Sequence, residues 1–180
     1  TQDSVLITTR DGAKIAAIVI RKKGAIAPLP VVLLCNVYAG PRNIVDAREA
    51  AARGYVGVVV NPRGKSLSPD EFFPYETDGQ DVYDVIDWIS RQAWCNGKVG
   101  MWGGSYLGFT QWAATKAGVH PALKTIVPAA SVAPGIDFPM ENNVSLNFPY
   151  SWTYYVSNNK YLDDTTYNDR DRWSNLNFDW

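Results

Sequence analysis

Several residue types and patterns are scarce in this chain of 180 residues. It has two cysteines and one histidine, too few for a disulfide framework or a histidine–cysteine zinc site. Its longest apolar runs, Val31–Cys35 and Val56–Val60, are far shorter than the ~20 residues of a membrane-spanning helix. Lys and Arg (17) nearly balance Asp and Glu (18), without the basic excess of a nucleic-acid binder. We therefore expect no metal, no cofactor, no membrane contact and no nucleic-acid partner.

The remaining composition is that of a folded protein. Hydrophobic residues make up 46% of the chain and charged residues 19%, a balance that can bury a core. The length corresponds to about one domain. We expect a soluble protein, located in the cytoplasm or, if a signal peptide was removed ahead of Thr1, in the periplasm or outside the cell.

The order of apolar runs predicts an α/β fold. Two β-rich runs, Val5–Thr9 and Ile15–Ile20, surround Arg10-Asp11-Gly12 and predict a hairpin. Further strands are predicted at Val31–Cys35, Tyr55–Val60, Lys98–Trp102 and Leu123–Val127, and helices at Asn43–Arg53, Asp78–Arg91 and Tyr106–Lys116. Strands that alternate with helices indicate a mostly parallel sheet with helices on both faces.

The chain changes character near Pro134. Residues 141–180 contain ten of the 23 aromatic residues and eight asparagines, and no strand-like run returns. We interpret residues 1–133 as the N-terminal portion of an α/β core and residues 134–180 as the start of a cap or lid insertion.

The most specific motif is Gly103-Gly104-Ser105-Tyr106-Leu107-Gly108, between a predicted strand and a predicted helix. This is the setting of a nucleophile elbow, the tight turn that presents a serine hydroxyl above the sheet of an α/β-hydrolase. The helix N-terminus places the backbone N–H of Tyr106 to donate to an oxyanion. The alternative is a plain Gly-Gly turn with Ser105 as the helix N-cap.

A second motif, Asn36-Val37-Tyr38, follows the strand Val31–Cys35. In an α/β-hydrolase, the loop after the third strand supplies the other donor to the oxyanion, and a phenol is a competent donor. Taken alone, Tyr38 is an ordinary loop tyrosine. Together with Ser105, it indicates an oxyanion hole.

These motifs resemble those of the cocaine esterase/X-Pro dipeptidyl-peptidase (CocE/NonD) family of α/β-hydrolases. The resemblance covers roughly residues 5–130 and includes Gly104–Gly108, Ala93–Met101, Asn36–Tyr38, Thr9–Gly12 and Arg63-Gly64. It implies that Ser105 is the nucleophile and that the Tyr38 hydroxyl and the Tyr106 backbone N–H form the oxyanion hole. Val37 stands where the family has proline, which could shift this loop.

The resemblance implies a serine hydrolase that cleaves an ester or amide, of the X-Pro dipeptidyl-peptidase or acyl esterase type, through an acyl-enzyme. The substrate would be a small-molecule ester, an amide or a short peptide. The single histidine, His120, follows a helix that carries the chain roughly 16 Å from Ser105; we expect it at the opposite edge of the sheet, at the surface or a helix end. The triad Asp and His would then come from the remainder of the same enzyme, a downstream segment or a second chain.

A rival hypothesis is a non-catalytic binding module in which the aromatic tail holds a peptide or glycan. Four tail aromatics could line an acyl pocket or pack a cap: Trp152, Tyr154, Tyr155 and Trp173.

Other polar candidates are given structural interpretations. Four aspartates recur at three-residue spacing: Asp78, Asp81, Asp84 and Asp87. On a helix this row turns through about 180°, so its carboxylates do not converge on a metal; we expect Asp78 to be an N-cap and the others to be largely solvated. Cys35 is expected in the core, and Cys95 in a turn, where it could be reactive.

Overall fold

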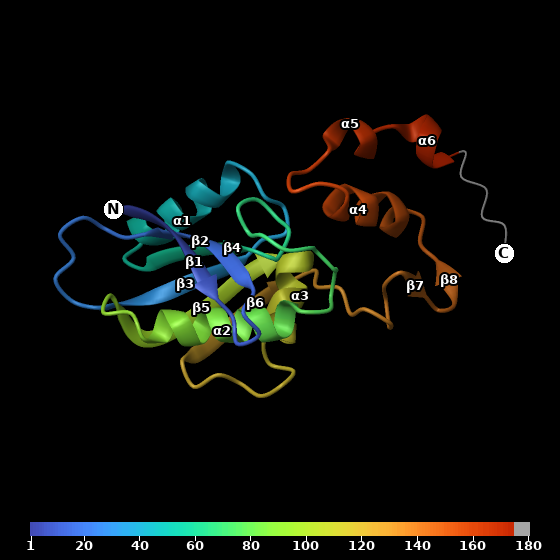
Figure 1. The fold of residues 1–180 in the computed structure, drawn as a ribbon. Helices are drawn as coiled ribbons and strands as arrows, with labels where there is room; N and C mark the ends of the chain where they lie inside the picture. Colours follow the sequence, from blue (N-terminus) through green and yellow to red (C-terminus); the bar gives the residue numbers. More distant parts are fainter. Residues whose placement is uncertain (175–180) are drawn as a thin grey trace.

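A computed structural model of the chain describes residues 1–174, and its centre is one six-stranded sheet (Figure 1). Its strands are β1 (Gln2–Thr8), β2 (Lys14–Ile20), β3 (Leu29–Cys35), β4 (Val56–Asn61), β5 (Cys95–Gly104) and β6 (Leu123–Ala129). They lie in the order β1-β2-β4-β3-β5-β6. The β1–β2 and β2–β4 pairs are antiparallel, whereas β3–β4, β3–β5 and β5–β6 are parallel. The predicted mostly parallel sheet is confirmed.

Three helices cover the two faces of this sheet, as the alternation predicted. They are α1 (Arg42–Ala52), α2 (Asp78–Ser90) and α3 (Tyr106–Ala113). Helix α1 packs on β4 and β2, while α2 and α3 contact each other and β5. In Figure 1, α1 lies above the sheet and α2 lies below it. Parallel crossovers require this arrangement, because each must pass over a face of the sheet.

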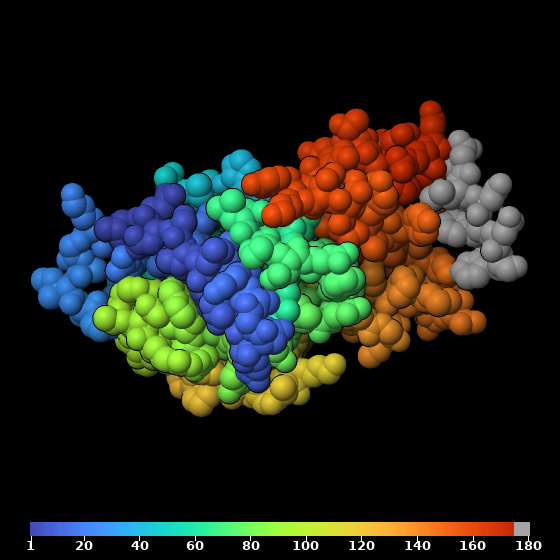
Figure 2. Space-filling view, viewed as in Figure 1, coloured from blue at the N-terminus to red at the C-terminus, as the bar shows by residue number. Residues whose placement is uncertain are grey.

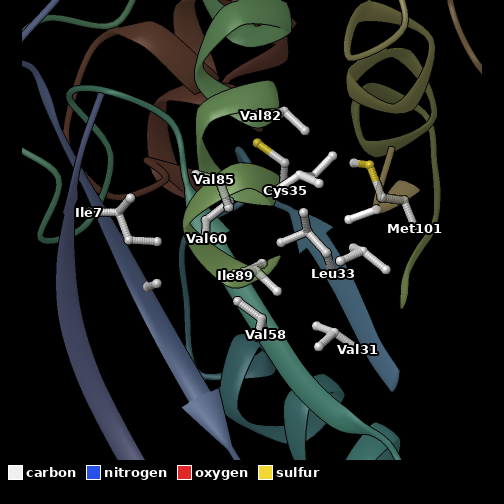
Figure 3. Packing of buried hydrophobic residues seen from close by; sticks show 14 of the residues in the cluster. Ile7, Val31, Leu33, Cys35, Val58, Val60, Val82, Val85, Ile89 and Met101 are labelled. Carbon is white, nitrogen blue, oxygen red and sulfur yellow. The ribbon is translucent and has the colours of Figure 1, made fainter. Parts of the chain in front are cut away.

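The main core lies between the sheet and α2. Alternate residues of β3 and β4, such as Leu33 and Val58, point to the same side as Val85 and Ile89 of α2 (Figure 3). The intervening residues, such as Leu34 and Val59, pack under α1 in a second cluster. Both central strands are therefore apolar on two faces, which explains their unbroken hydrophobic runs.

The chain beyond the sheet forms a separate group of short elements. These are β7 (Met140–Glu141), β8 (Val144–Ser145), α4 (Phe148–Ser157), α5 (Asp164–Tyr167) and α6 (Arg170–Ser174). In the space-filling view, the orange and red surface of this segment adjoins the green surface of the loop after β4 (Figure 2). The six final positions of the expected cap, residues 175–180, lie outside the described residues.

Two local predictions were wrong. Cys95 is the first residue of β5 and is buried rather than in an open turn; its thiol accepts a hydrogen bond from the N–H of Gly97. The tail does return to strand structure, in the two-residue hairpin β7–β8, which is too short for a periodic signal. Cys35 is a buried core residue, as predicted.

No helix within residues 1–174 is both long enough and apolar enough to span a bilayer.

Candidate active site

Ser105 lies on the tight turn between β5 and α3. Its backbone adopts φ 57° and ψ −125°, a conformation that costs a non-glycine residue ~1–3 kcal/mol. Hydrogen bonds hold it on both sides: its N–H donates to Ala129 O at the end of β6, and its carbonyl accepts from the N–H groups of Gly108 and Phe109. The side chain is exposed. A strained backbone that is anchored in this way presents the hydroxyl in a fixed direction.

Two glycines make this turn sterically possible. Gly103 has φ 140°, and a Cβ there would lie 2.6 Å from Leu107 Cβ; at Gly108, a Cβ would lie 2.9 Å from Ser131 Cβ. The generic motif has glycine two positions after the serine, where this chain has Leu107. In this chain the leucine packs over Gly103, and Gly108 allows α3 to approach the end of β6.

Tyr38 lies in the loop after β3, at the same edge of the sheet. Its hydroxyl oxygen is 3.3 Å from Ser105 Oγ. The backbone N–H of Tyr38 donates to Asn36 Oδ1 (2.9 Å). The side chain of the intervening Val37 is fully buried in the same apolar cluster as Tyr106 and Trp152. The substitution of valine for proline therefore leaves the tyrosine beside the serine.

Three buried asparagines support the Tyr38 loop. Asn36 Nδ2 donates to Asn43 Oδ1 (2.7 Å), Asn43 Nδ2 donates to Asn61 Oδ1 (3.1 Å), and Asn61 Nδ2 donates to the Asn36 carbonyl (2.6 Å). The three residues come from the end of β3, the start of α1 and the end of β4. Because buried amides must be paired, this closed network fixes the start of the loop relative to the sheet.

Trp152 of α4 also contacts Tyr38. Its indole Nε1 donates to the phenol oxygen across 3.1 Å, so the Tyr38 oxygen serves as the acceptor. The phenol proton is then available to Ser105 Oγ or to an oxygen bound beside it. The indole is buried and stacks on Tyr75 with ring centroids 6.0 Å apart.

The side chain of Tyr106 is buried beneath the turn, whereas its backbone N–H lies in the first turn of α3. N–H groups at this position have no helical carbonyl to bind. The hydroxyl donates to Asp78 Oδ2 (2.7 Å) and accepts from the N–H of Tyr75 (3.1 Å). Burial raises the pKa of Asp78 to about 6, while the bond from Tyr106 acts in the opposite direction.

The prediction that the aspartate row is capping and solvated was wrong. The helix begins at Asp78 after Thr77, and Asp78 and Asp81 are both buried. Each of the four has a partner: Tyr106 for Asp78, Arg63 for Asp81, Arg10 for Asp84, and Arg91 and His120 for Asp87. The row turns around α2, as predicted, but each of its carboxylates meets a polar or charged side chain.

Arg63 connects two of the segments that resemble the family, Thr9–Gly12 and Arg63-Gly64. It contacts Asp81 of α2 and, at 2.8 Å, Asp11 of the β1–β2 turn. The hydrogen bonds from Thr9 and Arg63 lower the pKa of Asp11 to about 2. One guanidinium thus ties the hairpin to the sheet and to α2.

His120 lies away from Ser105, as expected. Of the two placements expected for it, the surface or a helix end, the surface is wrong, because the side chain is buried. It accepts from the Ala122 N–H through Nδ1 (3.0 Å) and packs edge-on against Tyr83. It precedes Leu123, which pairs with Val99, whereas Ser105 follows the other end of β5. Along β5, about six residues separate Val99, near His120, from Ser105, which corresponds to roughly 20 Å.

Several site residues were not assigned from sequence. The sequence predicts Trp152 only as one of four tail aromatics and Asn43 only as part of a helix, and it assigns no role to Asn61. A signal existed for Asn36 and Asn61: each follows an apolar run of adjacent parallel strands, and such positions meet at one sheet edge. Of the other tail aromatics, Tyr155 stacks on Tyr167, and Tyr154 packs against Trp173.

Within residues 1–174, no group of three or more His, Cys, Asp or Glu side chains is arranged to hold a metal ion.

A mostly parallel sheet covered on both faces, with a serine on the glycine-lined turn between β5 and α3, defines the chain as an α/β-hydrolase. A family model, X-Pro dipeptidyl-peptidase (S15 family), matches residues 11–178. The chain belongs to this family of serine hydrolases, and the resemblance drawn from its motifs is confirmed.

Individual relatives agree with this placement. Cocaine esterase of Rhodococcus sp. (strain MB1 Bresler) is 39% identical over 136 residues, which cover 72% of this chain and 23% of that protein. The structure of an α-amino acid ester hydrolase matches 90% of this chain and 30% of its own, with a TM-score of 0.73 and 26% identity. A CocE/NonD family hydrolase from Staphylococcus aureus shares the fold, with a TM-score of 0.74 at 23% identity over 86% of this chain and 32% of its own. The chain thus spans less than a third of each relative's length.

Proposed function

We propose that Ser105 is the nucleophile of a serine hydrolase that cleaves ester or amide bonds through an acyl-enzyme. The observation that carries this proposal is the exposed, strained serine with a tyrosine hydroxyl 3.3 Å from its Oγ. A structural Gly-Gly turn requires no such tyrosine and no positive φ at the serine. Such strain is found where a reactive group must be presented.

Each residue has a defined part in the proposed reaction. Ser105 Oγ attacks the carbonyl carbon of the substrate and gives its proton to a general base. The Tyr38 hydroxyl and the Tyr106 backbone N–H donate to the resulting oxyanion. Collapse of the tetrahedral intermediate expels the alcohol or amine, which takes the proton back, and water then hydrolyses the acyl-enzyme.

We propose that the general base and its aspartate come from residues outside the described segment. The single histidine of the chain is buried at the opposite end of β5 and β6. The matched part of cocaine esterase is 23% of that protein, and a relative of that length has ample chain for both residues.

We further propose that residues 134–180 begin a cap over this site. Support comes from the end of the sheet at Ala129 and from α4, which brings Trp152 to the Tyr38 hydroxyl. Substrates would then be small: an ester, as the names of the cocaine esterase and α-amino acid ester hydrolase relatives suggest, or a short X-Pro peptide, as the family name suggests.

Intact-mass analysis after fluorophosphonate treatment tests the nucleophile. In the complete natural protein, we expect one adduct on Ser105 and none in Ser105→Ala. A p-nitrophenyl ester and an X-Pro p-nitroanilide then distinguish esterase from peptidase activity. An unlabelled Ser105 in folded protein would contradict the proposal and favour a non-catalytic binding module on the same fold.

A further inference from the structure

The loop after β4 contains a lysine whose side chain is completely buried, Lys65. A buried ammonium is stable only when it is hydrogen-bonded. Lys65 Nζ donates to two backbone carbonyls, that of Val156 (2.6 Å) and that of Asn159. Burial lowers the pKa of Lys65 to about 8, so the amine is mainly protonated at pH 7.

Val156 lies in the last turn of α4, and Asn159 is the second residue after the helix ends at Ser157. Carbonyls at a helix C-terminus lack intrahelical donors and carry partial negative charge. The Lys65 ammonium supplies the missing donors and a complementary charge. The next residue adds a third bond, because the Ser66 N–H donates to Lys160 O (2.9 Å). The loop after β4 thus holds the last turn of α4 and the residues just after it by three directional contacts.

The same helix carries Trp152, four residues before Val156. Residues four apart lie on one face of a helix, and both side chains are buried against the core. At that position, the Trp152 indole donates to the Tyr38 hydroxyl, which lies beside Ser105. One helical turn therefore joins the carbonyl held by Lys65 to the group that orients the proposed oxyanion donor.

We propose that Lys65 is a positioning residue for the oxyanion hole: by holding the C-terminal end of α4, it keeps Trp152 at the Tyr38 hydroxyl. This inference rests on the proposed function of Ser105 and Tyr38. Trp152 also packs against the rings of Tyr75 and Phe138, and the Lys65 hydrogen bonds add a restraint on distance and angle at the end of α4. Lys65 touches no substrate in this scheme and acts only through α4.

The test is a double-mutant cycle in the complete natural protein, with hydrolysis of p-nitrophenyl acetate as the readout. Lys65→Met keeps the length of the side chain and removes its donors. We expect kcat per fluorophosphonate-reactive site to fall roughly tenfold, with KM changed less than about twofold. In a Tyr38→Phe background, the same substitution should cause no further loss, because the hydroxyl through which Lys65 acts is already absent. Lys116→Met, at an exposed position after α3, is the matched control and should leave kcat unchanged.

A second variant removes the next link. Trp152→Phe keeps an aromatic ring but deletes the indole N–H, and it should lower kcat in the same way and also lose its effect in Tyr38→Phe. If Lys65→Met does not fold, Lys65→Gln takes its place in the cycle; its shorter side chain keeps an uncharged donor but cannot hold both carbonyls as the ammonium does, so we expect a smaller loss of kcat that is again absent in Tyr38→Phe.

Equal losses in both backgrounds would overturn the inference, because Lys65 would then act on general stability and not through Tyr38. An unchanged kcat in Trp152→Phe would overturn it as well. Failure of the proposed function is a different result: wild-type protein would show no Ser105 adduct, or Ser105→Ala would retain the hydrolysis.

Discussion

The indole Nε1 of Trp152 lies 3.1 Å from the hydroxyl oxygen of Tyr38, although the two residues are 114 positions apart. An indole N–H can only donate, so this contact leaves the phenol proton for a partner on the other side. Ser105 Oγ lies 3.3 Å from the same phenol oxygen, in a contact in which either hydroxyl can be the donor. The C-terminal helical segment therefore takes part in defining the site that the sheet edge presents.

Tyr38→Phe tests the hydroxyl itself. The phenyl ring preserves packing but removes the proposed donor to the oxyanion, and loss of one such donor typically lowers kcat by about 10²–10³. We expect this loss in ester hydrolysis by the complete protein, with KM nearly constant. Tyr55→Phe, at an exposed tyrosine, is the control. Turnover equal to wild type in Tyr38→Phe would remove Tyr38 from the oxyanion hole.

Gly103→Ala tests the geometry of the turn. The added Cβ would lie 2.6 Å from Leu107 Cβ at a φ of 140°, and such strain should cost about 2–4 kcal/mol of unfolding free energy. Gly104→Ala is the adjacent control, since its Cβ would meet Ala129 O at 3.3 Å and should cost less than about 1 kcal/mol. Urea unfolding measures both. Equal costs at the two positions would contradict the crowding by Leu107.

Asn43→Leu tests the asparagine network. The variant has similar volume but leaves Asn36 Nδ2 and Asn61 Oδ1 without partners, at about 1–3 kcal/mol for each buried group. We expect a fall of roughly 2–4 kcal/mol in unfolding free energy and a lower kcat through the Tyr38 loop. Val45→Ala, on the exposed side of α1, should change neither. A stable, fully active Asn43→Leu protein would show that the network does not hold Tyr38.

Asp78→Asn tests the buried carboxyl by its pH dependence. Burial raises the pKa of Asp78 from 3.8 to about 6, so between these values the folded state binds more protons than the unfolded state. Wild-type stability from this group is complete below pH ~4 and declines as pH rises through about 6. Asparagine keeps an acceptor for the Tyr106 hydroxyl and does not titrate. The variant should therefore gain stability relative to wild type between pH 4 and 7, by roughly 2–3 kcal/mol at most.

Urea unfolding of both proteins across this pH range measures the difference. The other ionisable groups around the carboxyl, Asp81, Tyr106 and Cys35, are common to the two proteins. Glu76→Gln, an exposed carboxyl just before α2, is the control. A difference between Asp78→Asn and wild type that does not vary with pH would contradict the raised pKa.

The aspartates of α2 show which features the sequence pattern predicts and which it does not. Three-residue spacing on a helix predicts how the carboxylates turn around α2, because helix geometry is local. It does not show which groups of other elements lie opposite them. Arg63 and Tyr106 come from distant parts of the chain, and their approach makes Asp81 and Asp78 buried partners instead of solvated residues.

The sequence by itself determined the order of strands and helices, the turn that carries Ser105 and the loop that carries Tyr38. Each depends on short-range physics: apolar runs that suit buried strands, helical spacing, and glycines at crowded turns. Tertiary structure alone decided that Trp152 meets Tyr38, that three asparagines close a network, and that Lys65 holds the end of α4. Most of these polar contacts join residues distant in sequence. A single buried hydrogen bond leaves no periodic trace, so only packing of the whole chain reveals it.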